Sequence, residues 1–379
     1  MTHYSIPGYV VDCKVEKEYY DVAAKFLADN DNFYVPRLLK YMISVEAAKV
    51  CCEYPATAED IAEKLGWDVE TVEKYIKESI VSGLAHKNHA NGKVNFAASI
   101  VNIADYGIVN PELIKKWGKG FLDLVKGIRT SDEYLGAYSA KWKEAEAAGE
   151  EYVAPPAEFR ILPKWKAIKD IPGVMPCENL LDILMEQEHI SSVRCMCRTV
   201  MRNDDVAWEG ELPEEGHCIK FGKVAEHFVE DMELGRYMSV EEVMKNLEML
   251  EDKPNYHMIG NSREVRGGFC NCCTDCCDMR MAAMEYKKFS DGIMPSRFVT
   301  VVDQESCIGC GKCAELCPFF ESIKIVDGKA VVNEETCMGC GICVVNCPEK
   351  ALSMIINKPV SHIPENGPQH ILDSLNLAE

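Results

Sequence analysis

One twelve-residue pattern occurs twice near the C-terminus of this chain. Residues 307–318 read CIGCGKCAELCP and residues 337–348 read CMGCGICVVNCP, so both follow C-x2-C-x2-C-x3-C-P. Glycines flank the second cysteine of each run (Gly309, Gly311, Gly339 and Gly341), where the backbone must turn tightly around a bound group. Cysteine thiolates at this spacing are typical of [4Fe–4S] cluster ligation. The repeat therefore predicts two metal centres and a carrier of single electrons.

The segments around the repeat predict short strands. Residues 297–303 and 322–335 are rich in β-formers, Asp327-Gly328 is a hairpin-turn pair, and residues 351–355 predict a last strand. Over about residues 297–356 the chain closely resembles the bacterial two-cluster ferredoxins. In such proteins the fourth cysteine of each run ligates the other cluster. The resemblance implies one cluster on Cys307, Cys310, Cys313 and Cys347, and a second on Cys337, Cys340, Cys343 and Cys317. Two zinc sites are the alternative, but zinc sites rarely repeat this run.

Composition narrows the class of protein. The chain has 379 residues, twenty cysteines and a formal net charge of −20. The sequence has no signal peptide and no apolar run long enough to span a membrane. Cysteine clusters in such a protein indicate metal sites rather than disulfides. We expect a cytoplasmic protein of an anaerobic cell, whose acidity disfavours nucleic acid.

Residues 36–100 resemble a winged helix-turn-helix. Residues 36–54 have apolar positions at helical spacing, Thr57 and Asp60 predict a capping box, and Asp68 predicts the N-cap of a third helix. Residues 84–98 predict a two-stranded wing turning at Asn91-Gly92. The third helix carries several carboxylates, which suits DNA poorly, so we expect a domain used for packing or partner docking.

The fold class that we predict is α+β with several domains. Residues 1–130 form a helical domain that includes an amphipathic helix at 111–129. Residues 131–160, which are charged and alanine-rich, form an extended linker arm. The cysteine-rich middle domain at 161–290 is expected to be mainly helical, with helices over residues 178–190, 220–232 and 241–250 and a Ser239–Glu242 capping box. The ferredoxin domain covers 291–356, and 357–379 is a C-terminal tail.

The middle domain contains a second set of eight cysteines, with Cys177 nearby. Adjacent cysteines point in different directions, so neighbours in the 270–277 run are expected to serve different centres, or one of each pair packs inward. Eight thiolates suffice for two further [4Fe–4S] clusters, and we expect at least one. A zinc site, a redox-active dithiol and a purely structural role remain alternatives. The candidate metal ligands are Cys195, Cys197, Cys218, Cys270, Cys272, Cys273, Cys276 and Cys277.

This middle region resembles a poorly characterised group of anaerobe iron–sulfur proteins that combine C-x-C-R, a later cysteine and a CNCC-x2-CC run. The resemblance implies metal binding and redox work, but no particular reaction. Other side chains that are candidates to tune a cluster or to assist at it are Arg194, Arg198, Arg202, Arg263, Arg266, His189 and His217. Structural roles are the competing interpretation for each of them.

No dinucleotide-binding G-x-G-x-x-G run, Walker A run or covalent-haem C-x-x-C-H is present. We therefore expect an electron-transfer protein, as a subunit or redox partner of a larger anaerobic oxidoreductase. An alternative is a reductase whose catalytic site is a middle-domain cluster or a free thiolate. A second alternative is a redox-sensing winged-helix regulator, against which the acidic third helix argues. A homo-oligomer is compatible with each of these interpretations.

Overall fold

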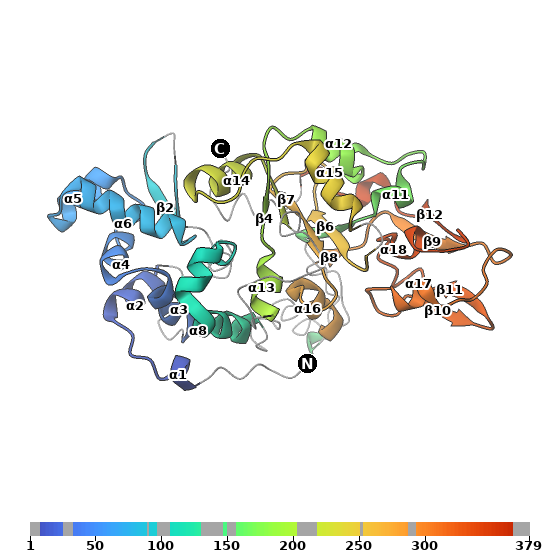
Figure 1. Cartoon of the computed structure of the whole chain (residues 1–379), viewed down its shortest axis with the longest axis horizontal. Coiled ribbons are helices and arrows are strands. Elements are labelled where there is room, and N and C mark those ends of the chain that lie inside the picture. Colours follow the sequence, from blue (N-terminus) through green and yellow to red (C-terminus); the bar gives the residue numbers. More distant parts are fainter. Residues whose placement is uncertain are drawn as a thin grey trace.

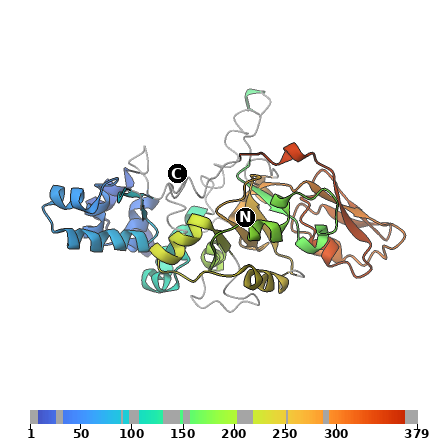
Figure 2. The same ribbon diagram turned by 90° about the horizontal axis from the view of Figure 1, so that it is seen from above.

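The computed structural model describes residues 8–25, 33–88, 91–96, 107–129, 147–149, 157–202, 218–250, 253–286 and 293–366. Three regions follow one another along the longest axis of the molecule (Figure 1). N-terminal helices lie at one end, a region built on a β-sheet lies in the centre, and the cysteine-repeat region lies at the other end. The view from above shows the same order (Figure 2). The central region therefore contacts both of the others.

Helices dominate the N-terminal region, and a short antiparallel hairpin follows them. The elements are α1 (Gly8–Val11), α2 (Lys17–Ala23), α3 (Tyr34–Met42), α4 (Val45–Cys51), α5 (Ala58–Leu65), α6 (Val69–Val81), β1 (Ala85–Lys87), β2 (Val94–Phe96) and α8 (Pro111–Arg129). The strands β1 and β2 pair from Ala85 opposite Phe96 to Lys87 opposite Val94.

Side-chain caps explain where these helices begin. The Thr57–Asp60 capping box and the Asp68 N-cap are both present, as the sequence predicts. The helix expected over residues 36–54 is instead two helices. Ile43 has extended backbone, and the Ser44 hydroxyl accepts a hydrogen bond from the Ala47 amide, so a new helix begins there.

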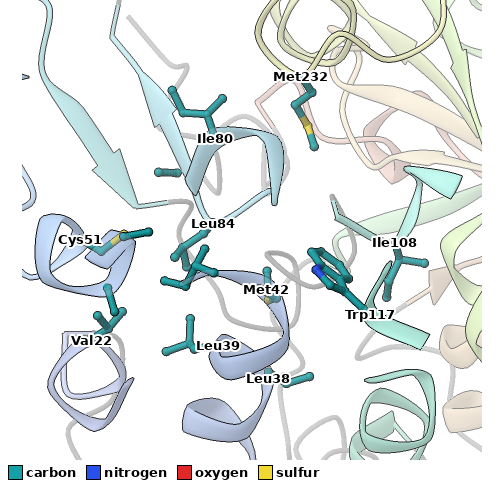
Figure 3. Close-up of a cluster of buried hydrophobic side chains, with 14 of the residues drawn as sticks. Val22, Leu38, Leu39, Met42, Cys51, Ile80, Leu84, Ile108, Trp117 and Met232 are labelled. Atoms are coloured by element: carbon teal, nitrogen blue, oxygen red, sulfur yellow. The ribbon is translucent and has the colours of Figure 1, made fainter. Parts of the chain in front are cut away.

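The apolar faces of these helices form one core. Figure 3 shows Leu39 and Met42 of α3 facing Leu84, with Trp117 of α8 close by. The helix α8 is broken at Gly118, whose φ of 73° and ψ of −174° are not helical. The same core includes Met232 of the central region, so the N-terminal helices pack directly on that region (Figure 3).

The central region is organised around a six-stranded sheet, which the sequence analysis did not predict. Its strand order is β4-β5-β7-β6-β3-β8. All neighbours are antiparallel except β3 and β8. The strands are β3 (Phe159–Leu162), β4 (Ile190–Val193), β5 (Cys218–Phe221), β6 (Tyr256–Gly260), β7 (Gly268–Cys272) and β8 (Ile293–Met294). They have two to five residues and contain cysteine, serine, asparagine and glycine, so they lack a clear apolar alternation.

Helical segments of the central region occur close to the three ranges that the sequence predicts, but they are shorter, and further helices occur that it does not predict. They are α11 (Trp165–Ile168), the 3-10 turn η1 (Pro176–Glu178), α12 (Leu180–Met185), α13 (Met196–Arg202), α14 (Gly222–Glu226), the π-helical η2 (His227–Asp231), α15 (Val240–Glu248) and α16 (Asp278–Tyr286). The Ser239–Glu242 capping box is present at the start of α15. The strand β3 begins at Phe159, inside the range predicted as linker arm.

The two faces of the sheet differ in chemistry. Ile219, Phe269 and Ile259 lie side by side across three strands and form an apolar core with residues of α12 and α15. On the other face Cys218 lies opposite Cys270 across β5 and β7. One face thus stabilises the fold, and the other carries thiols.

The cysteine-repeat region has two short sheets and two one-turn helices. Its elements are β9 (Phe298–Val302), α17 (Lys312–Glu315), β10 (Ile323–Val326), β11 (Lys329–Val332), α18 (Ile342–Val345), β12 (Leu352–Ile356) and the 3-10 turn η3 (Val360–His362). The strand β9 pairs with β12, and β10 pairs with β11 through the predicted Asp327-Gly328 turn.

A buried ion pair joins this region to the central one. The Arg297 guanidinium lies 2.6 Å from the Glu178 carboxylate, and both side chains are at most 3% exposed. The Lys164 amide also donates a 2.9 Å hydrogen bond to the Cys340 carbonyl. These contacts hold the two regions in one arrangement. Among the described helices none is long and apolar enough to cross a membrane.

Candidate metal centres

Four cysteines line one cavity in the repeat region, which we call the outer site. They are Cys307, Cys310, Cys313 and Cys347. The first three come from one loop, and the fourth comes from the end of the other run. Cys310 is exposed, so this site lies close to the protein surface.

A second cavity is lined by the other four cysteines of the repeat, and we call it the inner site. They are Cys317, Cys337, Cys340 and Cys343. Phe319, Met338 and Ile323 complete the lining with apolar surface. The structure thus brings together the same two groups of four that the sequence analysis proposed, including the exchange of the fourth cysteine. Four thiols around an apolar cavity fit a [4Fe–4S] cluster.

Glycines allow the loops to close around these cavities. Gly309 and Gly339 have φ values of 66° and 65°, which L side chains rarely adopt. A Cβ atom on Gly309 would overlap the Gly328 carbonyl, and one on Gly339 would overlap the Phe298 carbonyl. The loops therefore pack on the neighbouring strand and turn through backbone positions that only glycine provides.

Some cysteine sulfur atoms of the two sites make hydrogen bonds to neighbouring groups. The Ala330 amide donates to Cys307 Sγ at 3.4 Å, and the pKa of Cys307 is lowered chiefly by this bond. Burial raises the pKa of Cys343 to about 12. A 3.4 Å contact with the Thr300 hydroxyl acts in the opposite direction. Hydrogen bonds to the sulfur atoms tune the reduction potential of a bound cluster. Because their partners differ between the two sites, we expect different potentials.

Comparison with known protein families agrees with this geometry. Residues 300–354 match the family model described as a 4Fe-4S dicluster domain. The chain thus has a C-terminal ferredoxin-like domain, and the match supports [4Fe–4S] binding and an iron–sulfur electron-transfer role. No curated protein and no solved structure shows a significant match to this chain.

The middle cysteines are arranged differently, because their thiols lie against one another. Hydrogen-bond contacts run in a row from thiol to thiol through Cys197, Cys195, Cys218, Cys270, Cys272 and Cys277. Cys273 and Cys276 form a separate contacting pair. All eight predicted middle residues therefore gather in one place, whereas Cys177 lies apart in η1, where its carbonyl accepts a hydrogen bond from Arg160.

Sheet register explains this gathering. Cys218 of β5 lies opposite Cys270 of β7, and Cys272, two residues on, lies on the same face. Cys195 follows the end of β4, the strand next to β5. Residues separated by up to about eighty positions in the chain thus meet at one face of the sheet. We call the eight cysteines that gather there the middle thiols.

Contacts between neighbours shift the pKa values of the middle thiols in opposite directions. Hydrogen bonds from Cys197 and Cys218 hold the pKa of Cys195 well below its usual range. The pKa of Cys218 is raised well above its usual value by its neighbours Cys195 and Cys270. Contact with Cys218 and Cys272 again lowers the pKa of Cys270. Neighbouring thiols in the row thus have pKa shifts of opposite direction, and thiolates are the form that binds metals.

Two buried cations accompany the middle thiols. The Arg198 guanidinium donates to Cys273 Sγ and is only 3% exposed. Lys220 on β5 is 5% exposed, and its charge lowers the pKa of Cys270. Arg198 is expected from the sequence, whereas Lys220 is not, because only the position of Lys220 in β5 turns its side chain toward the cysteines.

Other candidate residues lie elsewhere. His189 stacks on Tyr237, with ring centroids 4.8 Å apart, away from the middle thiols. Arg263 donates to the carbonyls of Ile363 and Val360, so it holds the start of the C-terminal tail. Arg266 pairs with Glu264 at the surface, His217 lies outside the described residues, and so does the side chain of Arg202.

The middle thiols and the inner site share one apolar cluster. It contains Cys272 and Cys277 together with Met338 and Ile342 from the inner-site loop. Tyr256, which is fully buried, packs against Phe319 with ring centroids 4.9 Å apart. The inner site therefore adjoins the middle thiols.

Proposed function

We propose that this chain carries single electrons through [4Fe–4S] clusters at the outer and inner sites and on to a further centre at the middle thiols. The coincidence of two four-cysteine cavities with the family match carries the proposal. A [4Fe–4S] cluster takes up and releases one electron at low potential when bound. The chain supplies the thiolates, the spacing and the surroundings that tune this exchange.

The order of the sites supports a direction of transfer. Cys310 at the outer site is exposed, and the neighbouring Ile308 is 64% exposed, so a partner can approach there. The inner site is buried against the central region. Electrons would enter at the outer site, pass the inner site and reach the middle thiols, as expected of a subunit or redox partner of a larger anaerobic oxidoreductase.

At the middle thiols we propose at least one further iron–sulfur centre. Its candidate ligands are the six thiols of the row, Cys195, Cys197, Cys218, Cys270, Cys272 and Cys277. Cys273 and Cys276, which the sequence also offers as ligands, form the separate pair. The lowered pKa values of Cys195 and Cys270 favour thiolates, which are the ligands that iron requires. Buried Arg198 and Lys220 would offset the negative charge of such a centre.

For residues 36–100 we propose a winged helix that serves packing rather than DNA binding. The helices α4, α5 and α6, followed by the β1–β2 hairpin, have the required order, with α3 as an additional helix before them. The carboxylate of Glu78 on the third helix accepts hydrogen bonds from the Ser44 amide and hydroxyl, and Lys77 pairs with Glu233 of the central region at 2.6 Å. His86 of the wing is fully buried near His227. The third helix and the wing thus make their contacts within the protein, as expected of a domain used for packing.

The test is to purify the full chain without oxygen and to measure iron, acid-labile sulfide and zinc per chain. About eight irons and eight sulfides are expected from the two C-terminal clusters alone, and more than eight of each from a third centre. Reduction should give electron paramagnetic resonance signals and single-electron delivery to a viologen dye. Zinc without sulfide would refute the proposal.

A second candidate function is a reductase, with the catalytic chemistry at the middle thiols. It is favoured by the Cys273–Cys276 pair, which contacts a buried arginine and stands apart from the row of six thiols. A separate pair of this kind is not needed for electron transfer alone.

A further inference from the structure

Cys273 and Cys276 differ from the other middle cysteines in sequence spacing and in contacts. They enclose Thr274 and Asp275 in a Cys-x-x-Cys motif just before helix α16. Their sulfur atoms and a carboxylate oxygen of Asp275 lie within 4.8 Å of one another. A Cys-x-x-Cys pair before a helix is the arrangement of thiol–disulfide oxidoreductases.

Burial of the two thiols is unequal. Cys276 is 1% exposed, whereas Cys273 is only half-buried. Arg198, from the helix α13 that follows β4, donates to the sulfur of Cys273. The accessible thiol thus has a cation beside it, which stabilises a thiolate nucleophile, and the inaccessible thiol is placed to resolve a bond formed by the first.

The same loop is tied to the inner site. Arg280 of α16 donates one 2.6 Å hydrogen bond to the Thr274 carbonyl, between the two cysteines. It donates a second 2.6 Å bond to the carbonyl of Pro318, the residue after Cys317. One guanidinium therefore connects the Cys-x-x-Cys loop with a loop that lines the inner site.

We propose that Cys273 and Cys276 form a redox-active dithiol that reduces low-molecular-weight disulfides with electrons arriving from the inner site. The inference rests on the proposed electron-transfer function and adds its acceptor. A small disulfide is favoured over a protein disulfide because Cys273 is half-buried and Arg198 beside it is only 3% exposed.

The proposed cycle consumes two electrons and two protons for each disulfide that it reduces. Two electrons, delivered one at a time by a low-potential donor protein through the C-terminal sites, and two protons cleave the Cys273–Cys276 bond into two thiols. The Cys273 thiolate then attacks the substrate disulfide, so that a mixed disulfide forms and one substrate thiol leaves with a proton. Attack by Cys276 on the Cys273 sulfur re-forms the internal disulfide and releases the second thiol. The sum is RSSR + 2 e⁻ + 2 H⁺ → 2 RSH.

A direct test measures the thiol state of the loop. Trypsin cleaves after Arg266 and Arg280, so residues 267–280 form one peptide that contains all five cysteines of the run. Full-length protein, either oxidised or reduced by dithionite without oxygen, is quenched in denaturant with N-ethylmaleimide. The oxidised state should carry two labels fewer than the reduced state. In Cys273→Ser and Cys276→Ser the two states should carry equal numbers of labels.

Activity is tested with oxidised glutathione as the probe. The reduced wild-type chain should release two thiols for each disulfide consumed. Cys276→Ser should stop at a stable glutathione adduct on Cys273, and Cys273→Ser should form no adduct. The matched control is Cys52→Ser, a half-buried thiol of the N-terminal region, which should behave as the wild type.

Iron content and electron delivery to a viologen dye separate this inference from the proposed function. Both should be unchanged in the two serine variants. Loss of iron from either variant would make these cysteines metal ligands and overturn the dithiol. Equal labelling of both states in a wild-type chain that still reduces the dye would also overturn it, while electron transfer would stand. A wild-type chain that takes up no electrons would refute the proposed function itself.

Discussion

The two sets of eight cysteines in this chain are positioned by different means. At the C-terminus, six of the eight ligand candidates come from two tight loops, and the thiols surround two cavities. In the centre, three segments contribute thiols that contact one another directly on a sheet face. The first set depends on local turns, and the second depends on the register of distant strands. Substitutions in the sheet should therefore disturb the middle thiols while the C-terminal sites persist.

The largest effect is expected from Cys340→Ala at the inner site. Loss of one of four thiolates should remove about four irons from the chain, because a cubane requires its full set of ligands. Iron analysis and electron paramagnetic resonance measure this loss. Cys52→Ala serves as the control. An unchanged iron content would refute the ligand assignment, whereas loss of iron from every site would show that the two sets are not independent.

Glu178→Gln tests the connection between the regions. It leaves the buried Arg297 without its anionic partner, which typically lowers the free energy of unfolding by about 3–5 kcal/mol. The urea dependence of the visible iron–sulfur absorbance measures the change. Glu264→Gln removes an exposed pair with Arg266 and should cost less than about 1 kcal/mol. Equal effects of the two variants would contradict the assigned role of the buried pair.

Gly268→Ala tests the register that assembles the middle thiols. Gly268 has a φ of 150°, and an added Cβ would overlap the Ile219 carbonyl on β5. Backbone strain and overpacking together should cost about 3 kcal/mol and separate Cys218 from Cys270. Gly260→Ala is the control in the same sheet, because its Cβ would meet nothing within 4 Å. Faster alkylation of the middle cysteines in Gly268→Ala alone is the expected result.

Acidification should destabilise the packing of the β1–β2 hairpin, which contains His86, against the central region. Burial lowers the pKa of His86 from 6.5 to about 4, with a smaller effect of His227 in the same direction and an opposing one of Asp231. Between these values the unfolded chain binds the proton and the folded chain does not, so stability rises with pH in this window and falls on acidification. A loss of about 2 kcal/mol is expected between pH 7 and pH 4.5. In His86→Leu this part of the pH dependence should disappear, and its persistence would assign the effect to other groups.

Local signals predicted much of the secondary structure. The capping boxes at Thr57 and Ser239 and the Asp327-Gly328 turn are present where the residues indicate them, because each depends on contacts within four positions of the chain. The break at Ser44 was missed, since apolar periodicity continues across it. The central sheet was missed for the opposite reason: its short strands have no clear periodicity, and long-range pairing alone stabilises them.

The sequence by itself indicated the candidate sites at the C-terminus, because each run of twelve residues carries its own spacing, its glycines and its closing proline. Only the tertiary structure decided which thiols meet in the centre. Strand register placed Cys218 opposite Cys270, and helix packing brought Arg198 to Cys273 and Arg280 to Pro318. Contacts between residues far apart in the chain depend on the packing of whole elements, and a linear pattern does not contain that information.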